Sequence, residues 1–255
     1  MTTPHAATTQ QAVLITGGGG GIGRAAAHAF AEAGAGVLVV GRTESSLIET
    51  AKDHETIRVL AADITDTDAP ELIVDAALRE FGRLDVLVNN AAALGFGTLP
   101  GLDIGQATTQ LNTNLLAPIR LTAHAVPALE AAHGTVVNIS SAGSLGSRSW
   151  PGNGVYGAAK VALDFLTRTW AVELAPRGIR VVALAPGVTD TDFGPRAGMT
   201  DEQYQGLLRQ MAAQAPAGRV GTPEEVAWWI TQLVRPEAGY VTGTVLAVDG
   251  GLSLT

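Results

Sequence analysis

Five consecutive glycines lie between a short apolar segment and a helix-forming one near the start of the chain. Residues 13–27 read VLITGGGGGIGRAAA, in which the β-branched, apolar run favours a buried strand and the alanines favour a helix. Glycine tolerates positive φ and lets a phosphate approach without meeting a Cβ, while the unpaired amides of a helix start favour an anion. The spacing of Gly17, Gly21 and Gly23 therefore predicts a strand, turn and helix that bind a dinucleotide. A glycine-rich linker is the alternative, and the flanking segments argue against it.

Apolar segments alternate with helical patterns along the whole chain. The expected strands are residues 13–15, 37–40, 57–61, 84–88, 134–139, 179–185 and 245–248. One long helical stretch is expected at 105–131, with Asn112 and Asn114 in its middle, and further helices at 154–174 and 202–213. This alternation predicts an α/β fold: a Rossmann-type doubly wound, seven-stranded parallel sheet flanked by helices. Residues 11–255 are expected to be one domain, and residues 1–10 a flexible tail without the apolar core of a signal peptide.

The composition excludes several classes of function. The formal net charge is −8 and no basic residues are concentrated, so no nucleic-acid partner is expected. The chain has no cysteine, which excludes disulfides and thiolate metal sites, and its five histidines are scattered, so no metal site is expected. No apolar run approaches the roughly 18 residues of a membrane span. We expect a soluble protein with a cytoplasmic location.

Residues that follow the predicted strands are expected to meet the cofactor, because ligands of doubly wound sheets bind outside the carboxyl ends of the strands. Arg42 and Thr43 follow the second strand, where an acidic residue would hold the 2′-hydroxyl of NAD. The arginine and the glycine before it suit a 2′-phosphate, which favours NADP(H) over NAD(H); a solvated surface arginine is the alternative. Asp63 is expected either to bond the adenine amino group or to begin a turn. The other expected cofactor contacts are Gly17, Gly20, Gly21, Ile22, Gly23, Ile64, Asn90, Ala91, Ala92, Tyr156, Lys160, Pro186, Gly187, Val188 and Thr191.

Tyr156 and Lys160 lie four residues apart in a predicted helix, and hence on one helical face. A tyrosine and a lysine at this spacing are usually accidental neighbours. This chain, however, has only two lysines, and one of them lies a single turn after a tyrosine, just beyond a strand end where the site is expected. The pair is therefore a candidate for chemistry.

At this point the residues resemble the short-chain dehydrogenase/reductase family, in its classical subgroup. The shared motifs are TGGGGGIG at 16–23, NNAA at 89–92, Asn114, the set of Ser141, Tyr156 and Lys160, PGVTDT at 186–191 and DGG at 249–251. They occur in the family's order and extend from about residue 12 to residue 252. The family usually has NNAG, so Ala92 stands in place of a glycine; it is expected to be tolerated if its backbone angle is ordinary.

The resemblance implies roles for four residues. Tyr156 is implied as the acid/base, and Lys160 as the group that binds the nicotinamide ribose and lowers the tyrosine pKa. A free tyrosine titrates near about 10, and a neighbouring ammonium together with a charged nicotinamide favours the phenolate, so we expect the pKa to fall. Ser141 is implied to hold the substrate oxygen, with Ser140 or Ser144 as fallbacks. Asn114 is implied to anchor a water in a proton relay.

The same resemblance implies a homotetramer, and the sequence indicates how the substrate is enclosed. Residues 191–218 are expected to be a mobile cover. Phe96, Trp150 and Val188 are expected to line an apolar substrate pocket together with Ser141. Trp228 and Trp229 are expected to belong to the core or to an interface.

The leading functional hypothesis is an oxidoreductase that transfers a hydride between NADP(H) and a ketone or secondary alcohol. An NAD-dependent secondary alcohol dehydrogenase that uses the same site is the second hypothesis. A dinucleotide-sensing protein without chemistry is the third, and the complete set of Ser141, Tyr156 and Lys160 argues against it.

Overall fold

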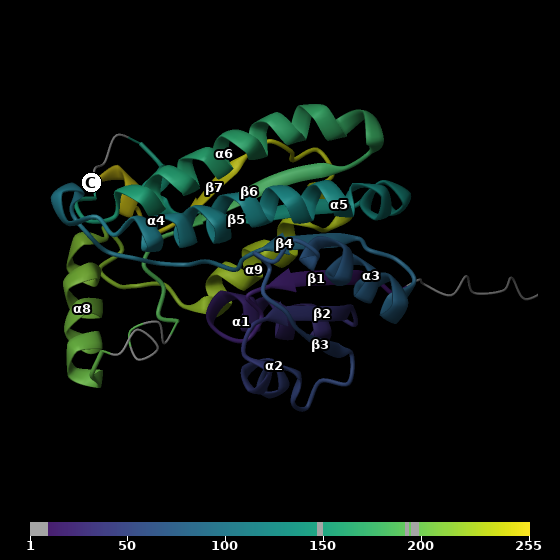
Figure 1. Cartoon of the computed structure of the whole chain (residues 1–255), viewed down its shortest axis with the longest axis horizontal. Helices are drawn as coiled ribbons and strands as arrows, with labels where there is room; N and C mark the ends of the chain where they lie inside the picture. Colours follow the sequence, from purple (N-terminus) through teal and green to yellow (C-terminus); the bar gives the residue numbers. More distant parts are fainter. Residues whose placement is uncertain (1–9, 147–149, 192–193, 195–198) are drawn as a thin grey trace, which may run out of the picture.

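Seven apolar segments form one parallel sheet at the centre of the molecule (Figure 1). The computed structural model describes residues 10–146, 150–191, 194 and 199–255. The strands are β1 (Ala12–Thr16), β2 (Gly36–Gly41), β3 (Ile57–Ala61), β4 (Val86–Asn89), β5 (Thr135–Ile139), β6 (Arg180–Pro186) and β7 (Val245–Val248). They pair in the order β3-β2-β1-β4-β5-β6-β7, and every pair is parallel. The predicted doubly wound fold is confirmed.

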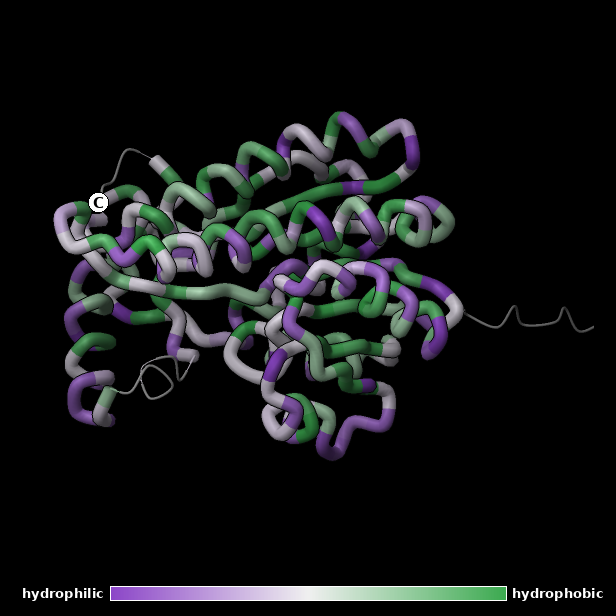
Figure 2. The backbone as a smooth tube through the Cα atoms, in the orientation of Figure 1, coloured by the Kyte–Doolittle hydropathy of each residue, from purple (hydrophilic) through white to green (hydrophobic). Residues whose placement is uncertain are grey.

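Helices cover both faces of the sheet. They are α1 (Gly21–Glu32), α2 (Glu44–Ala51), α3 (Ala69–Phe81), α4 (Ile104–Leu111), α5 (Ala117–Ala132), α6 (Gly154–Leu174), α8 (Asp201–Gln214) and α9 (Pro223–Leu233). α1 and α9 pack together over one face, while α3, α5 and α6 cover the other. Figure 2 shows hydrophobic residues along the strands and mixed residues along the helices, because each helix buries only one of its sides.

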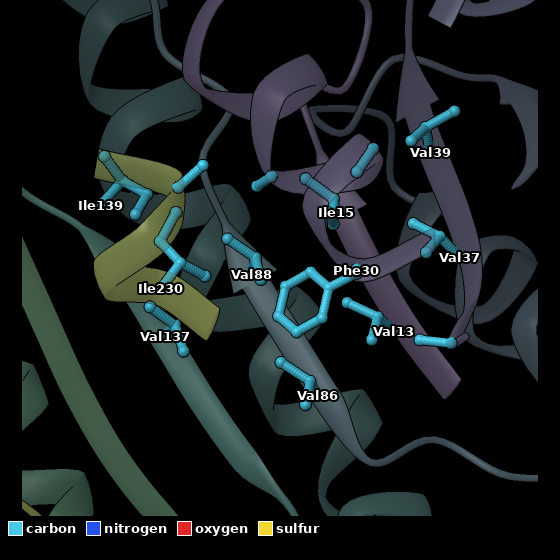
Figure 3. Packing of buried hydrophobic residues seen from close by; sticks show 14 of the residues in the cluster. Val13, Ile15, Phe30, Val37, Val39, Val86, Val88, Val137, Ile139 and Ile230 are labelled. Atoms are coloured by element: carbon cyan, nitrogen blue, oxygen red, sulfur yellow. The ribbon is translucent and has the colours of Figure 1, made fainter. Parts of the chain in front are cut away.

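Alternate residues of β1 enter two separate cores, because successive side chains of a strand point to opposite faces. Val13 and Ile15 pack with Phe30 of α1 on one face. Leu14 packs on the other face, in the cluster to which α3 and α5 contribute. Figure 3 shows the Phe30 ring lying among Val13 and Val86 of neighbouring strands. Burial on both faces explains why β1 is apolar at every position before Thr16.

The long helix predicted at 105–131 is interrupted, and that prediction is corrected. A wider, π-helical turn, η2 (Asn112–Leu116), separates α4 from α5. Within it, Asn114 Oδ1 accepts a hydrogen bond from the Ala93 amide at 3.0 Å, and Asn114 Nδ2 donates to the Ala93 carbonyl at 2.7 Å. Asparagine is disfavoured inside a helix unless its side chain finds such a partner, and π turns are frequent at functional sites. Through these two hydrogen bonds, the π-helical turn holds Ala93 and the segment that follows β4 in place.

The sheet reverses its winding between β1 and β4, and a ligand site is expected outside the carboxyl ends of these strands. α8 lies beyond this end of the sheet in Figure 1. It belongs to the predicted cover over 191–218, of which residues 192–193 and 195–198 lie outside the described part. The predicted tail likewise falls, over residues 1–9, outside the described residues.

Trp228 and Trp229 keep 54% and 38% of their surface exposed. The prediction that they belong to the core is therefore wrong, and the interface alternative stays a prediction. Their rings meet edge to face on α9, with centroids 4.8 Å apart. Within the described ranges, no helix is long and apolar enough to cross a membrane. The same residues contain no group of three or more His, Cys, Asp or Glu side chains placed to hold a metal ion.

Candidate active site

The glycine-rich turn between β1 and α1 is packed so closely that side chains are excluded from it. Gly17 has φ +68°, and a Cβ there would lie 2.8 Å from the Ala91 Cα. Gly21 has φ +52°, and its Cβ would lie 2.9 Å from the Thr191 Cβ. α1 then begins without a capping side chain and without an acidic residue in its first turn. Its first amides are therefore left for an anion, as the dinucleotide prediction requires.

Gly23 differs from the other predicted glycines because it does not line the cavity described below. A Cβ at Gly23 would lie 2.3 Å from the Gly17 carbonyl oxygen and 2.6 Å from Asn90 Nδ2. Its absence lets the first turn of α1 rest against the glycine-rich turn. Gly23 thus shapes the site through helix packing.

Arg24 and Thr50 brace the glycine-rich turn from behind, which the sequence analysis did not foresee. Arg24 Nη2 donates to the Gly19 carbonyl at 2.8 Å, and Arg24 Nε donates to Thr50 Oγ1 at 3.0 Å. Thr50 Oγ1 donates in turn to the Gly18 carbonyl at 2.9 Å. Arg24 directly follows the glycine motif and could have been noticed, whereas the sequence gives no signal for Thr50 on α2. The Arg24 guanidinium is therefore engaged in hydrogen bonds within the protein.

Two adjoining cavities lie at the carboxyl ends of the strands and share the walls formed by Gly17, Gly20, Ala91 and Ala92. The larger has a volume of about 890 Å³ and the smaller about 280 Å³. Every predicted cofactor contact except Gly23 lines one of them. An elongated space with closely approaching backbone at its middle fits a dinucleotide, with its diphosphate at the glycine-rich turn.

The smaller cavity contains the residues predicted to meet the adenosine end. Arg42, Thr43, Asp63 and Ile64 line it, together with Ser46, which the sequence analysis missed. Asp63 Oδ1 accepts hydrogen bonds from the Thr65 amide at 2.9 Å and the Thr65 hydroxyl at 2.7 Å. The turn alternative for Asp63 is therefore realised, while the residue also lines the cavity.

The charge of Arg42 acts on the Asp63 carboxyl at this end of the site. Burial by itself would raise the pKa of the Asp63 carboxyl, but the two Thr65 hydrogen bonds and the Arg42 charge bring it below its ordinary value. Arg42 is exposed. The carboxylate is thus held ionised beside the arginine.

Polar groups at the ends of β1 and β4 fasten these strands together. Asn90 Nδ2 donates to the Thr16 carbonyl at 2.9 Å, and the Asn90 and Ala91 amides donate to Thr16 Oγ1 at 3.0 and 3.1 Å. Thr16 Oγ1 lies 3.3 Å from the Val88 carbonyl, to which it donates.

Ala92 is not among the described residues with positive φ, so the alanine in place of the family's glycine is accommodated by an ordinary backbone angle.

The larger cavity brings together Ser141, Tyr156 and Lys160. Ser141 follows β5, and the other two lie in the first two turns of α6. The Tyr156 hydroxyl lies close enough to Ser141 for the serine to lower the pKa of the tyrosine. Lys160 Nζ lies 5.6 Å from the centre of the Tyr156 ring and donates to the Ile139 carbonyl at 2.7 Å. The three side chains predicted from different segments are therefore neighbours.

Of the three candidate serines, Ser141 is the one that the structure pairs with Tyr156. Ser144 Oγ instead lies 2.6 Å from Asp164 Oδ2, and Ser140 Oγ lies 3.1 Å from Ser144 Oγ. The fallback residues thus form a hydrogen-bonded group with Asp164, although Ser140 also lines the larger cavity.

Burial dominates the pKa values of Tyr156 and Lys160. It raises the pKa of Tyr156 to about 12, although the hydrogen bond with Ser141 lowers it. It lowers the pKa of Lys160 to about 8, although the charge of Asp164 raises it. The expected fall of the tyrosine pKa is therefore not produced by the protein's own groups. The reason is that Lys160 points its amino group at the Ile139 carbonyl and is itself hard to keep charged when buried.

Asn114, the residue implied to anchor a water, is fully buried and does not line either cavity. Its side chain makes both hydrogen bonds to Ala93 described above. This arrangement places Ala93, which lines the smaller cavity, rather than presenting the amide to the cofactor space. The relay role of Asn114 stays a prediction.

The substrate end of the larger cavity is mostly apolar. Phe96, Trp150 and Val188 line it as predicted, joined by Leu94 and Leu252. One side of α8 completes the wall, with residues spaced as one helical face requires: Leu207, Gln210, Met211 and Gln214. That i, i+3, i+4, i+7 spacing is visible in the sequence and could have identified them.

Comparisons with known proteins show which family the chain belongs to. The family model described as enoyl-(acyl carrier protein) reductase matches residues 18–253. The 3-oxoacyl-[acyl-carrier-protein] reductase of Thermotoga maritima is 35% identical over 244 residues, which cover 94% of this chain and 96% of that protein.

Two solved structures have the same fold. A short-chain dehydrogenase/reductase of Caenorhabditis elegans superposes with a TM-score of 0.89 at 36% identity, covering 96% of each chain. The 3-ketoacyl-(acyl-carrier-protein) reductase of Brucella melitensis, solved with NADH, superposes with a TM-score of 0.87 at 29% identity, covering 95% of this chain and 98% of that one. With its sheet order, its glycine-rich turn and these matches over nearly its whole length, the chain belongs to the short-chain dehydrogenase/reductase family of oxidoreductases.

Proposed function

We propose that this protein interconverts a neutral ketone and a secondary alcohol with NADP(H), and that Tyr156 exchanges the proton. The observation that carries this proposal is that Ser141, Tyr156 and Lys160 line one cavity, which continues to the glycine-rich turn. A proton donor, an oxygen-binding hydroxyl and a dinucleotide cradle in one space are what carbonyl reduction needs.

Each side chain has a distinct task in this proposal. Ser141 donates a hydrogen bond to the substrate oxygen and stabilises the negative charge that develops on it. Tyr156 delivers its proton to the same oxygen, or removes it in the reverse direction. Lys160 places a positive charge beside the tyrosine and is suited to bond the nicotinamide ribose. The nicotinamide, when bound, supplies or accepts the hydride.

The protonation state of Tyr156 favours the reductive direction at neutral pH. Because burial raises its pKa to about 12, the phenol keeps its proton and is ready to donate it. Alcohol oxidation requires the phenolate, and a positively charged nicotinamide favours that form. We therefore propose that oxidation speeds up with rising pH while reduction needs no prior ionisation.

Support for NADP(H) comes from the smaller cavity. Gly41, Arg42, Thr43 and Ser46 line its rim, and none of these residues at the end of β2 is acidic. A guanidinium and hydroxyls are suited to a 2′-phosphate. NAD(H) is the second candidate, because a family relative, the Brucella melitensis reductase, was solved with NADH.

The lining of the larger cavity supports a neutral, largely apolar substrate. Among the described residues that line it, only Tyr156 and Lys160 are ionisable, and no carboxylate or guanidinium faces it. A charged substrate group would therefore lack a counter-charge apart from Lys160, which is 98% buried. Gln210 and Gln214 of α8 provide neutral polar contacts.

A panel of neutral cyclic, aromatic and aliphatic ketones, with turnover followed by the loss of NADPH absorbance, tests the proposal. We expect turnover with at least one class and none with Tyr156→Phe. Dinucleotide binding, measured by calorimetry, without turnover across the panel would instead support a sensing protein.

We also propose that the chain forms a homotetramer. Apolar side chains are exposed along α6, where Val161, Phe165 and Val172 keep 50%, 63% and 76% of their surface accessible. Trp228 and Trp229 form a second apolar area on α9, beside β7. Two separate apolar faces suit the two interface types of a tetramer. Light scattering is expected to give four times the 26.1 kDa chain mass, and Phe165→Glu is expected to reduce it.

A further inference from the structure

A buried carboxylate lies behind the candidate active site and has no part in the chemistry proposed above. Asp164 lies one helical turn after Lys160 on α6, and only 4% of its surface is exposed. Its Oδ1 atom is buried without a hydrogen-bond partner among the described residues. Burying a carboxylate is costly unless an opposite charge or hydrogen bonds compensate it. The groups around Asp164 must therefore supply this compensation.

Hydroxyl groups supply part of that compensation. Ser144 Oγ lies 2.6 Å from both Asp164 Oδ2 and the Ser141 carbonyl oxygen, and 3.1 Å from Ser140 Oγ. One hydroxyl has one hydrogen, so Ser144 donates to only one of the two oxygens. The Ser144 backbone amide already donates to the Ser141 carbonyl at 2.9 Å, and an ionised carboxylate is the stronger acceptor. The hydroxyls therefore donate in sequence, from Ser140 to Ser144 and from Ser144 to Asp164.

Two cations act on the same carboxylate. Burial raises the pKa of Asp164 above its ordinary value, and the hydroxyls of Ser140 and Ser144 and the charges of Arg168 and Lys160 offset only part of this rise. Arg168 is exposed, so water and salt screen its charge. Lys160 is buried on the same side, and Asp164 is the charge that favours its ammonium form. In the described part of the chain, no further ionisable group from β5, η3 (Ala142–Ser144) or α6 contributes to either residue.

We propose that Asp164 is a positioning residue of the active site: its buried negative charge, held by Ser144, balances the ammonium of Lys160 one helical turn away. The i, i+4 spacing places the two side chains on one face of α6. Lys160 donates a hydrogen bond to the Ile139 carbonyl, and Asp164 accepts one from Ser144. Both side chains therefore bind the segment that contains Ser141. Asp164 thereby keeps Lys160 charged where Tyr156 needs a cation. Only this kinetic consequence rests on the function proposed above.

The small number of lysines makes a direct test feasible. The full-length chain contains only Lys52 and Lys160, so labelling with [ε-¹³C]lysine gives two NMR signals, and Lys52→Arg identifies that of Lys160. Asp164→Asn keeps the size and the acceptor for Ser144 but removes the charge. We expect the titration midpoint of Lys160 to fall by about one pH unit or more in this variant, as for the loss of an opposite charge a few ångströms away. An unchanged midpoint would overturn the proposal.

Two further variants separate charge from packing. Thr167→Val alters another buried polar residue of α6, an uncharged one whose hydroxyl bonds Asn138 and the Leu163 carbonyl; the change is expected to lower the melting temperature and leave the Lys160 midpoint in place. Ser144→Ala removes the donor to Asp164 and is expected to shift the midpoint downward by less than Asp164→Asn. If Asp164→Asn does not fold, an unshifted midpoint in Ser144→Ala overturns the proposal instead.

The kinetic arm then connects Asp164 to catalysis. With an active ketone from the panel, the fall in rate at alkaline pH is expected to begin at lower pH in Asp164→Asn than in the wild type. If the panel shows no turnover at all, the proposed function fails while the NMR titration still decides the role of Asp164. A shifted NMR midpoint with an unmoved pH profile would overturn the kinetic consequence.

Discussion

The Lys160 amino group donates a hydrogen bond of 2.7 Å to the Ile139 carbonyl oxygen, which ties α6 to the last residue of β5. Ser141 lies two residues further along that segment. The lysine and the serine are therefore held by the same strand end, and the position of one depends on that of the other. Tyr156, one turn earlier on the helix, completes the group.

Tyr156→Phe removes only the hydroxyl that is proposed to transfer the proton. We expect kcat to fall by about 10²-fold to 10⁴-fold, the usual contribution of a positioned acid or base, with dinucleotide affinity almost unchanged. Steady-state kinetics and calorimetry measure the two quantities. Tyr240→Phe is the matched control, because that tyrosine is fully exposed, and it should retain wild-type rates. Undiminished turnover in Tyr156→Phe would rule out the proposed acid.

Lys160→Met tests the cost of the buried ammonium through the pH dependence of stability. Burial lowers the pKa of Lys160 in the folded protein to about 8, below its ordinary value of 10.5. The unfolded chain therefore binds more protons between these two pH values, and the stability of the wild type rises with pH there. The unfolding free energy of the wild type should therefore rise by about 3 kcal/mol between pH 7 and pH 10.5 through this group. The variant lacks the ammonium and should not show this rise. Urea unfolding at several pH values measures this. Parallel curves for the two proteins would contradict the buried charge.

Arg42→Asp tests the preference for the phosphorylated cofactor. Removing a charged donor from a phosphate and adding a carboxylate is expected to lower kcat/KM for NADPH by about 100-fold, because one charge-assisted hydrogen bond contributes about 1.5–3 kcal/mol. The value for NADH should fall much less or rise. Arg79→Asp changes an exposed arginine of α3 and should leave the ratio of the two cofactors intact. A wild type that uses NADH as well as NADPH would refute the preference.

Gly17→Ala tests the close approach of the backbone in the glycine-rich turn. The added Cβ would meet the Ala91 Cα at 2.8 Å and would be placed at a φ of +68°, so folding and dinucleotide affinity should both suffer. Gly34→Ala is matched in its positive φ of +85° but meets nothing within 4 Å. We expect about 1–2 kcal/mol of destabilisation from the backbone angle alone in Gly34→Ala, and more in Gly17→Ala. Equal effects in melting experiments would show that packing around Gly17 is unimportant.

Much of the fold could be predicted because buried parallel strands leave a clear signal. Their continuous apolar runs, such as the residues from Val13 to Ile15, differ from every helical pattern in the chain. The break at η2 could not be predicted from periodicity, because its cause is the contact between Asn114 and Ala93, which are distant in sequence. The exposure of Trp228 and Trp229 also escaped prediction, since two large aromatic residues on a helix suit a core as well as a surface.

The candidate site was predictable where a motif fixed it and unpredictable where only packing did. The structure brings Ser141, Tyr156 and Lys160 together as expected. The expected fall of the Tyr156 pKa does not occur in the protein without its nicotinamide, because sequence shows a neighbouring lysine but not that Lys160 is buried with its amino group on the Ile139 carbonyl. The group around Asp164 was missed for the same reason.

The brace formed by Arg24 and Thr50 has a consequence for how tightly a nucleotide can be held. Its hydrogen bonds to the Gly18 and Gly19 carbonyls restrain two residues that would otherwise lose the most conformational freedom on complex formation. The loop is thus preorganised, and the entropic penalty of ordering it is met during folding instead of during ligand capture. Such a rigid cradle should speed the capture of a nucleotide, since no rearrangement of the turn has to accompany its arrival.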